Sequence, residues 1–223
     1  MIHFKQDTGF GPIYIIAEDK GEMVVSDSSG KEMEICLIRH GKPQFWKRYE
    51  PYTVISGVQV ENAILDYYNS GIETDSLPPQ GSLDVAKTAA IAICSGVKRT
   101  VETAAALGIA CRLIHEPLFR EPEVPYGFWR KTRLPLMLWF IISKIGWLFG
   151  YSLNCESIEN TRIRAEKAAS YLIKAAKEHG RVVLVGHSFM NSMIFRVLQK
   201  RQWRSRRPFD WKFWGCNVLT YQE

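Results

Sequence analysis

Polar residues that could bind and transform an anionic ligand follow three separate apolar runs of the chain. They are Arg39, His40 and Gly41 after the first run, Ser95 and Arg99 after the second, and His187 after the third. A guanidinium group binds phosphate oxygens through paired donors, and histidine can act as a nucleophile or a proton carrier near neutral pH. Two arginines and two histidines brought to one place would therefore form a phosphate-binding site with groups suited to catalysis.

Each cluster taken alone also has a purely structural interpretation. Arg39-His40-Gly41 is compatible with a surface turn. Arg99 could pair with Glu102 on an exposed helix, and a lone histidine such as His187 is usually a core residue. The setting of the two histidines favours a site, because both end apolar runs beside arginine or glycine. The other three histidines, which lack this setting, are His3, His115 and His179.

The alternation of short apolar runs with helical patterns predicts how these residues are positioned. The predicted strands are 35–38, 90–94, 111–119 and 182–185, and the predicted helices are 56–70, 97–107, 157–179 and 188–201. This alternation is typical of an α/β fold, here a three-layer sandwich with a mostly parallel central sheet flanked by helices. Ligands bind such sheets beyond the carboxyl ends of the strands, where the polar clusters are expected to meet.

Two regions do not follow this alternation. Residues 1–34 are expected to form an N-terminal extension or a hairpin added to the sheet. Residues 126–153 are rich in Trp, Phe and Leu, and are expected to form a small apolar helical insert near the active site, as a cap or as part of the core. Because no repeat or low-complexity linker divides the chain, residues 1–223 are predicted to form a single domain.

The order of the polar clusters resembles that of the histidine phosphatase superfamily, also called phosphoglycerate mutase-like. The motifs that carry the resemblance are Ile38-Arg39-His40-Gly41, Ser95 with Arg99 and Thr103-Ala104, Leu118-Phe119-Arg120-Glu121, and Val185-Gly186-His187. Glu156-Ser157 at the start of the long predicted helix also fits the family. The resemblance covers roughly residues 35–201, and four motifs in the expected order are far more specific than Arg-His-Gly alone.

The resemblance implies a metal-independent phosphatase that needs no cofactor. His40 would attack phosphorus and form a phosphohistidine. The residues that would hold the phosphoryl oxygens or line the phosphate site are Arg39, Gly41, Ser95, Arg99 and His187. Covalent catalysis divides the displacement into two steps, and cationic groups stabilise the oxygens without a metal ion. The chain shows no clustered carboxylates of the kind that bind magnesium.

The resemblance also implies a general acid, which would protonate the leaving alkoxide and afterwards activate water. Glu121 matches the family position and follows an apparent strand. Glu116 and Glu123 lie close to it in sequence, and Glu121 could instead be an ordinary surface carboxylate. We expect Glu121 to be the acid.

Composition and charge restrict the class of protein and its partners. Of the 223 residues, 46% are hydrophobic and 23% are charged, which is typical of a folded domain rather than a disordered chain. The net charge of +6 suits a small phosphorylated substrate, an acidic membrane surface or nucleic acid. An odd number of cysteines without a CxxC pair indicates a reducing compartment and no zinc site. The N-terminus lacks the pattern of a signal peptide, so we expect a cytoplasmic location.

Three other functions compete with the phosphatase. A phosphoglycerate mutase would use the same groups, but such mutases carry Ser and Trp-Asn shortly after the nucleophile motif, where this chain has residues 42–47. A serine hydrolase with Ser188 as nucleophile lacks glycine at Met190 and has no later histidine. A non-catalytic phosphate-binding protein is the third alternative. Nucleic acid is not expected, because the aromatics of the basic segment 203–214 would pack on the body of the protein.

Three roles are open for residues 128–150. The segment lies just after the expected acid, so it could be a lid, a buried helical hairpin or an element that contacts an anionic membrane. In the membrane interpretation the lipid-facing side chains would be Trp139, Phe140, Trp147 and Phe149, with Arg130, Lys131 and Arg133 on the headgroups. Lys42 and Lys47, after the nucleophile motif, hint at a second anionic group on the substrate. The sequence does not predict the oligomeric state.

Overall fold

The computed structural model describes residues 32–222 and contains a five-stranded sheet at its centre. The strands are β1 (Glu32–Arg39), β3 (Ile91–Cys94), β4 (Leu113–His115), β6 (Arg181–Gly186) and β7 (Cys216–Gln222). Their order is β4-β3-β6-β1-β7, with the first four parallel and β7 antiparallel to β1. The predicted α/β fold with a mostly parallel sheet is confirmed. The expected N-terminal extension lies outside the described residues, except that residues 32–34 begin β1.

The register of the strands brings their carboxyl ends to one level. Val185 of β6 pairs with Ile38 of β1 on one side and with Cys94 of β3 on the other. Parallel strands in register release the next residues at the same edge, and these residues are Arg39, Ser95 and Gly186. The polar clusters are therefore adjacent in space although about 150 positions separate the first from the last.

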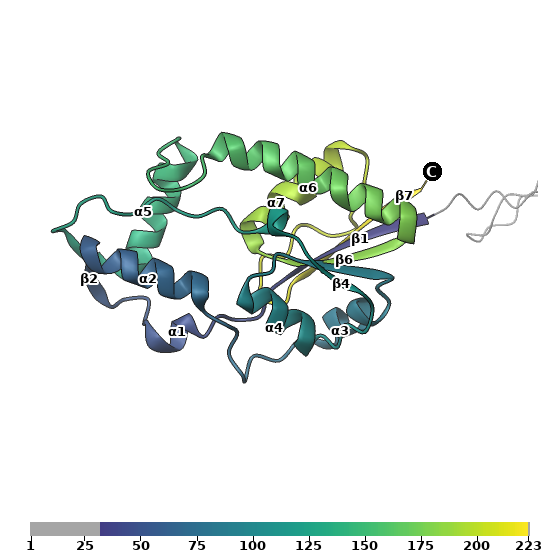
Figure 1. Ribbon diagram of the computed structural model, residues 1–223, viewed down its shortest axis with the longest axis horizontal. Helices are drawn as coiled ribbons and strands as arrows, with labels where there is room; N and C mark the ends of the chain where they lie inside the picture. Colours follow the sequence, from purple (N-terminus) through teal and green to yellow (C-terminus); the bar gives the residue numbers. More distant parts are fainter. Residues whose placement is uncertain (1–31, 223) are drawn as a thin grey trace, which may run out of the picture.

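Helices cover both faces of the sheet (Figure 1). They are α6 (Ile158–His179) and α7 (Ser188–Lys200) on one face, and α3 (Gln80–Lys87) and α4 (Lys98–Ala106) on the other. Side chains alternate along β1 because successive residues of a strand point to opposite faces. Ile35 and Leu37 pack in the core with α6 and α7, whereas Cys36 and Ile38 pack in the core with α3 and α4.

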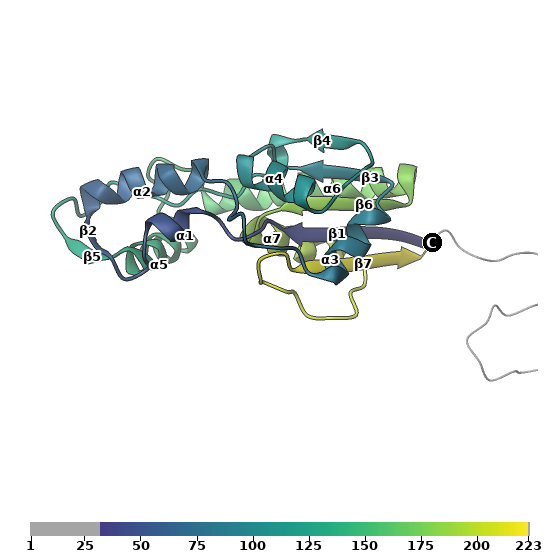
Figure 2. The ribbon, with the colours of Figure 1, turned by 90° about the horizontal axis from the view of Figure 1, so that it is seen from below.

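A second group of elements lies beyond the carboxyl ends of the parallel strands, at the end of the molecule far from its carboxyl terminus (Figures 1 and 2). It contains α1 (Phe45–Arg48), β2 (Val54–Ser56), α2 (Gly57–Asn69), β5 (Arg133–Pro135) and α5 (Leu136–Leu148), with β2 paired to β5. We call this group the cap lobe. It has its own apolar core, which includes Phe45 and Trp139. The expected helical insert corresponds to α5, but half of the lobe comes from residues 43–70, which the sequence did not link to it.

The structure corrects two expectations. The run 111–119 is mostly not a strand: β4 is short, and Pro117–Phe119 forms a 3₁₀ turn (η1) with Glu116 accepting a hydrogen bond from the Leu118 amide. Trp139 and Trp147 are buried, so they cannot face a lipid surface as expected. Within residues 32–222, no helix has both the length and the apolar character needed to cross a membrane.

Candidate active site

His40 lies at the carboxyl end of β1 and is 1% exposed. Its Nδ1 is 2.7 Å from the backbone oxygen of Gly41. A carbonyl oxygen only accepts hydrogen bonds, so Nδ1 carries the proton and the lone pair of the neutral ring is on Nε2. The ring of His187 lies edge-on to it at a centroid distance of 5.2 Å. His40 therefore has the tautomer that a nucleophile acting through Nε2 requires.

His187 is held by a chain of hydroxyl groups. Its Nε2 is 2.8 Å from Ser95 Oγ, which is 3.1 Å from Thr100 Oγ1, and Thr100 donates to the backbone oxygen of Val97. Since the Thr100 proton is used, Ser95 donates to Thr100 and accepts from His187 Nε2–H. The buried Nδ1 of His187 has no partner among the described residues. A buried polar atom without a partner indicates a place for a ligand.

Both histidines are neutral at pH 7. Burial lowers the pKa of His40 and of His187 well below the ordinary value, and the positive charge of Arg99 lowers both further. The hydrogen bond from His40 to Gly41 acts in the opposite direction but is the weaker effect. His40 Nε2 therefore keeps its lone pair at neutral pH.

Arg99 is buried in the first turn of α4. Its Nη1 donates to the backbone oxygens of Tyr67 at 3.3 Å and Tyr68 at 3.1 Å, in the last turn of α2, and its Nε has no partner among residues 32–222. The interpretation of Arg99 as the partner of Glu102 is wrong, because Glu102 accepts from the Ile72 amide and lies near Lys98. Backbone oxygens orient a guanidinium without neutralising it, so Arg99 keeps its full charge for an anion.

Arg39 is positioned by the loop that leads into β7. Its guanidinium carbon lies 3.9 Å from the centre of the Phe213 ring, and Nη1 donates to the backbone oxygen of Trp211. Phe213 also contacts the His40 ring, with centroids 5.9 Å apart. Burial lowers the pKa of Arg39, although an arginine stays protonated under all ordinary conditions. The loop from residue 204 to 215 is a part of the site that the motifs did not reveal.

Gly41 differs from its expected role. The resemblance implies that Gly41 lines the phosphate site, but a β-carbon at this position would collide with the Trp214 ring. The Gly41 amide donates to Thr103 Oγ1 at 3.0 Å, and Thr103 in turn donates to the Arg99 backbone oxygen. Gly41 therefore fixes the His40 tautomer and ties β1 to α4, and its N–H is not free for phosphate.

Glu121 is half-buried and lies at the start of α7. Its two carboxylate oxygens accept from the amides of Phe189 at 3.2 Å and Met190 at 3.0 Å. Amides in the first turn of a helix have no partner within the helix, and here Glu121 supplies the acceptors. The negative charge of Glu121 partly offsets the lowering of the Arg39 pKa by burial. Glu121 is therefore not an ordinary surface carboxylate, while its role as the acid stays a prediction.

An ion pair supports the segment that carries Glu121. Arg164 of α6 binds Glu156 with its Nη2 at 2.6 Å and donates through Nη1 to the backbone oxygens of Leu118 and Arg120. The side chain of Arg164 thus fixes the two residues that flank Phe119, just before Glu121. The sequence motif included Glu156, but only the fold shows that Arg164 links it to the expected acid.

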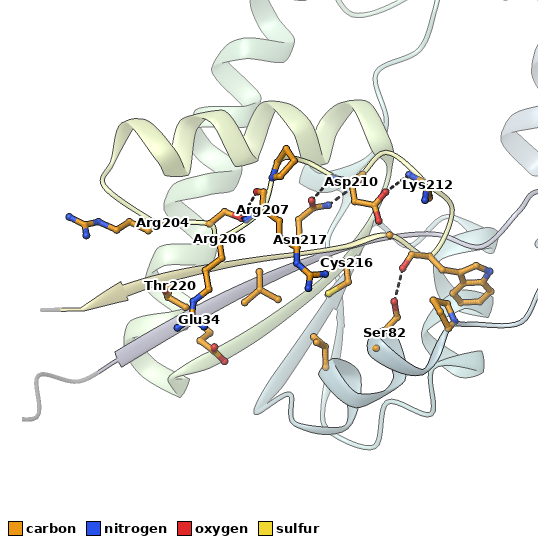
Figure 3. A pocket seen from close by; sticks show the side chains of 18 of the residues that line it. Glu34, Ser82, Arg204, Arg206, Arg207, Asp210, Lys212, Cys216, Asn217 and Thr220 are labelled. Carbon is orange, nitrogen blue, oxygen red and sulfur yellow. Dashed lines mark hydrogen bonds between the residues drawn. The ribbon is translucent and has the colours of Figure 1, made fainter. Parts of the chain in front are cut away.

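A cavity of about 660 Å³ lies along the outer strand β7 and reaches Phe213 and Trp214 of the loop beside the site (Figure 3). Glu34, Arg206, Arg207 and Asp210 are among the residues that line it, whereas the two site histidines, Arg99 and Glu121 are not. The cavity therefore is not the phosphate site. Within residues 32–222, no three histidine, cysteine or carboxylate side chains gather as metal ligands.

The fold is similar to that of several solved structures. A phosphoglycerate mutase from Bacillus anthracis matches with a TM-score of 0.55 and 13% identity, covering 88% of this chain and 91% of that one. A mycobacterial glucosyl-3-phosphoglycerate phosphatase matches with a TM-score of 0.54 and 14% identity, covering 85% and 90%. The product of open reading frame Rv3214 from Mycobacterium tuberculosis matches with a TM-score of 0.53 and 14% identity, covering 86% and 95%. At such low identity these likenesses show the fold alone.

No curated protein matches the sequence closely. The model of the histidine phosphatase superfamily (branch 1) matches residues 82–223, which include Ser95, Arg99, Glu121 and His187. Arg39 and His40 lie outside the match, and the fold itself places them beside the matched residues. This family supports a phosphatase or mutase-like role. Because the match covers more than half of the chain, the protein belongs to the histidine phosphatase superfamily.

Proposed function

We propose that the protein is a metal-independent phosphatase that hydrolyses a phosphomonoester through a phosphohistidine on His40. The observation that carries the proposal is the buried His40 ring, which has its lone pair on Nε2 and contacts His187. Around it lie three buried nitrogen atoms without partners among the described residues, namely Arg39 Nε, Arg99 Nε and His187 Nδ1. The two arginine Nε–H groups would donate to the oxygens of a phosphoryl group, and His187 Nδ1 would donate as well once it is protonated.

The reaction would proceed in two displacements. His40 Nε2 attacks phosphorus, the bond from phosphorus to the ester oxygen breaks, and Glu121 gives its proton to the departing oxygen. Water then attacks the phosphohistidine while Glu121 takes up a proton, which releases inorganic phosphate and restores the free Nε2. Arg39 and Arg99 stabilise the charge on the oxygens in both steps, and His187 donates through Nδ1 once the bound dianion has raised its pKa.

A mutase is the alternative, since it would pass the phosphoryl group from His40 back to the product. The residues that follow the nucleophile motif favour the phosphatase, because residues 42–47 stand where such mutases carry Ser and Trp-Asn.

Lys42 and Lys47 also belong to this stretch. They form ion pairs with Glu73 at 3.1 Å and Asp75 at 2.8 Å. These ion pairs give both lysines a partner within the protein.

The proposed function is tested by following phosphate release from 4-nitrophenyl phosphate with excess chelator present. We expect the rate to be unchanged by the chelator, because every charge that stabilises the transferring group comes from side chains. Mutase activity is measured in parallel, as isomerisation of 3-phosphoglycerate with and without 2,3-bisphosphoglycerate. Loss of activity with chelator would overturn the metal-independent mechanism, and isomerisation of 3-phosphoglycerate faster than its hydrolysis would overturn the phosphatase.

Lys144 of α5 supports a narrower substrate class. Its Nζ lies 3.6 Å from the centre of the Phe189 ring and 4.2 Å from that of Trp147. The amide of the same Phe189 holds Glu121, and the charge of Glu121 acts on Lys144 as well as on Arg39. Lys144 thus lies against the residue whose amide holds the proposed acid. Because an acid faces the leaving group, we propose that Lys144 binds a second anionic group on the leaving alcohol.

Lys144→Met is expected to reduce kcat/KM about tenfold for 3-phosphoglycerate, whose leaving group carries a carboxylate, since a charge-assisted hydrogen bond contributes ~1.5 kcal/mol or more. Glycerol 3-phosphate lacks that carboxylate, and we expect its kcat/KM to change less than twofold. Lys144→Arg should retain the preference, and Lys174→Met, on the exposed side of α6, is the matched control. If kcat/KM fell equally for both substrates, Lys144 would contribute to packing and not to binding of the leaving group.

A further inference from the structure

Helix α5 of the cap lobe is apolar on all sides. Ser143 is buried, and Lys144 is the only charged residue of the helix and rests on aromatic rings. The inner side of the helix, which includes Leu136, Trp139 and Trp147, is fully buried. A surface helix of a globular protein normally carries polar residues on its outer side, so an outer side without them requires an explanation.

The outer side of α5 forms a continuous apolar strip that we call the outer stripe. Its residues and their exposed fractions are Leu138 at 38%, Ile141 at 46%, Ile145 at 50%, Leu148 at 47% and Phe149 at 88%. The spacing of three and four residues aligns the first four along one line of the helix, and Phe149 extends the line past its end. Single exposed apolar residues are ordinary, whereas an aligned group of this kind marks an interaction site.

The charges around the outer stripe indicate the partner. Residues 126–153 contain three arginine or lysine residues before α5, Lys144 within it, and no aspartate or glutamate. Arg130, Lys131 and Arg133 are exposed and form no ion pair with another described residue. They follow Trp129, which is 58% exposed. Basic residues beside exposed apolar and aromatic side chains are typical of helices that lie in the headgroup region of an anionic membrane.

We infer that the outer stripe docks on an anionic lipid bilayer, with Arg130, Lys131 and Arg133 on the headgroups. With 13 residues, α5 is shorter than the ~20 residues that cross a bilayer, so it would lie along the interface. A second copy of the chain is a poorer partner, because its own segment 126–153 is basic and offers no aspartate or glutamate to Arg130, Lys131 and Arg133. The inference does not depend on the catalytic proposal, since none of these side chains contacts the phosphate site.

Flotation with lipid vesicles tests the inference. Wild-type protein is mixed with vesicles of phosphatidylcholine alone and of phosphatidylcholine with phosphatidylglycerol at low and high salt. We expect binding to the phosphatidylglycerol vesicles, weaker binding at high salt, and little binding to phosphatidylcholine alone. The stripe variant Leu138→Ser/Ile145→Ser/Phe149→Ser and the charge variant Arg130→Gln/Lys131→Gln/Arg133→Gln should each bind at least tenfold more weakly than wild type.

The matched control is Leu77→Ser/Ile163→Ser, which removes apolar side chains that are 77% and 49% exposed elsewhere, and it should bind like wild type. Thermal unfolding of every variant verifies the fold. Absence of wild-type binding, or a stripe variant that binds like wild type, would overturn the inference. A wild-type dimer that becomes monomeric in the stripe variant, without lipid binding, would identify a second copy as the partner.

Discussion

Replacement of His40 by alanine is expected to lower kcat/KM for any phosphomonoester by about 10⁴-fold or more. This corresponds to at least ~5 kcal/mol of transition-state stabilisation. The reason is that His40 Nε2 is the atom proposed to form the bond to phosphorus, and its lone pair is set by the hydrogen bond from Nδ1 to Gly41. The measurement is the rate of phosphate release, together with the affinity for vanadate as a ligand of the phosphate site.

Two further variants separate chemistry from folding. His40→Asn keeps a donor for the Gly41 oxygen and more of the side-chain volume than alanine, so it should fold better than His40→Ala yet remain as inactive. His179→Ala removes a partly exposed histidine at the end of α6 and should be fully active. Retention of even a tenth of wild-type activity by His40→Asn would contradict nucleophilic catalysis by His40.

Glu121→Gln is expected to lower kcat/KM by 10²-fold or more for a phosphomonoester of an alkyl alcohol. General acid catalysis contributes about 10² to 10⁴-fold when the leaving group is basic. The loss should be much smaller for 4-nitrophenyl phosphate, because nitrophenolate departs readily without a proton. The measurement is therefore kcat/KM for glycerol 3-phosphate and for 4-nitrophenyl phosphate, since this parameter reports the first displacement.

The comparison of the two substrates separates acid catalysis by Glu121 from its structural role at the start of α7. Its oxygens accept from the Phe189 and Met190 amides, and glutamine can replace only one of these two acceptors. Weaker capping of α7 costs about 1 kcal/mol and would lower activity for both substrates alike. Equal losses would therefore assign Glu121 to capping and require another acid. Glu123, which is exposed on the same segment, provides the control variant Glu123→Gln and should keep its activity.

The sequence predicted the part of the site that depends on local pattern. An apolar run followed by a polar cluster indicates a buried strand and its carboxyl end, and the pairing of Val185 with Ile38 and Cys94 confirms that these ends meet. The fold class could be predicted for the same reason, since strands and helices alternate in the middle of the chain. The helices 56–70, 97–107, 157–179 and 188–201 agree with α2, α4, α6 and α7 within two residues at each end.

The remaining features depend on contacts between distant segments. The pairing of β2 with β5 joins two three-residue strands whose periodicity is too short to detect, so the cap lobe was predicted only in part. The loop before β7 was interpreted as a basic aromatic tail, and no local signal shows that Phe213 contacts Arg39 and His40. In the sequence, Lys144 only interrupts the apolar run 134–149. The fold places it beside the residue that holds Glu121.

The membrane contact could also be predicted only in part from the sequence. Composition correctly singled out residues 128–150 as unusually apolar, but it could not tell the inner side of α5 from the outer side. Both sides are apolar, so the helical period carries no information about orientation. Serine substitutions at Trp139 and Trp147 would therefore disrupt the core, and the exposed residues Ile141 and Leu148 belong to the side that is free to bind.

The central claim is that phosphate is transferred to His40, and trapping the phosphoenzyme tests it most directly. The protein is mixed with phosphomonoester, quenched within milliseconds at alkaline pH, where phosphohistidine persists, and digested for mass spectrometry. We predict one phosphate on the peptide that contains His40, lost on brief exposure to acid, and absent from His40→Asn. Substrate turnover in the same samples with no phosphate on His40 at any quench time, or with phosphate on another residue, would contradict the mechanism.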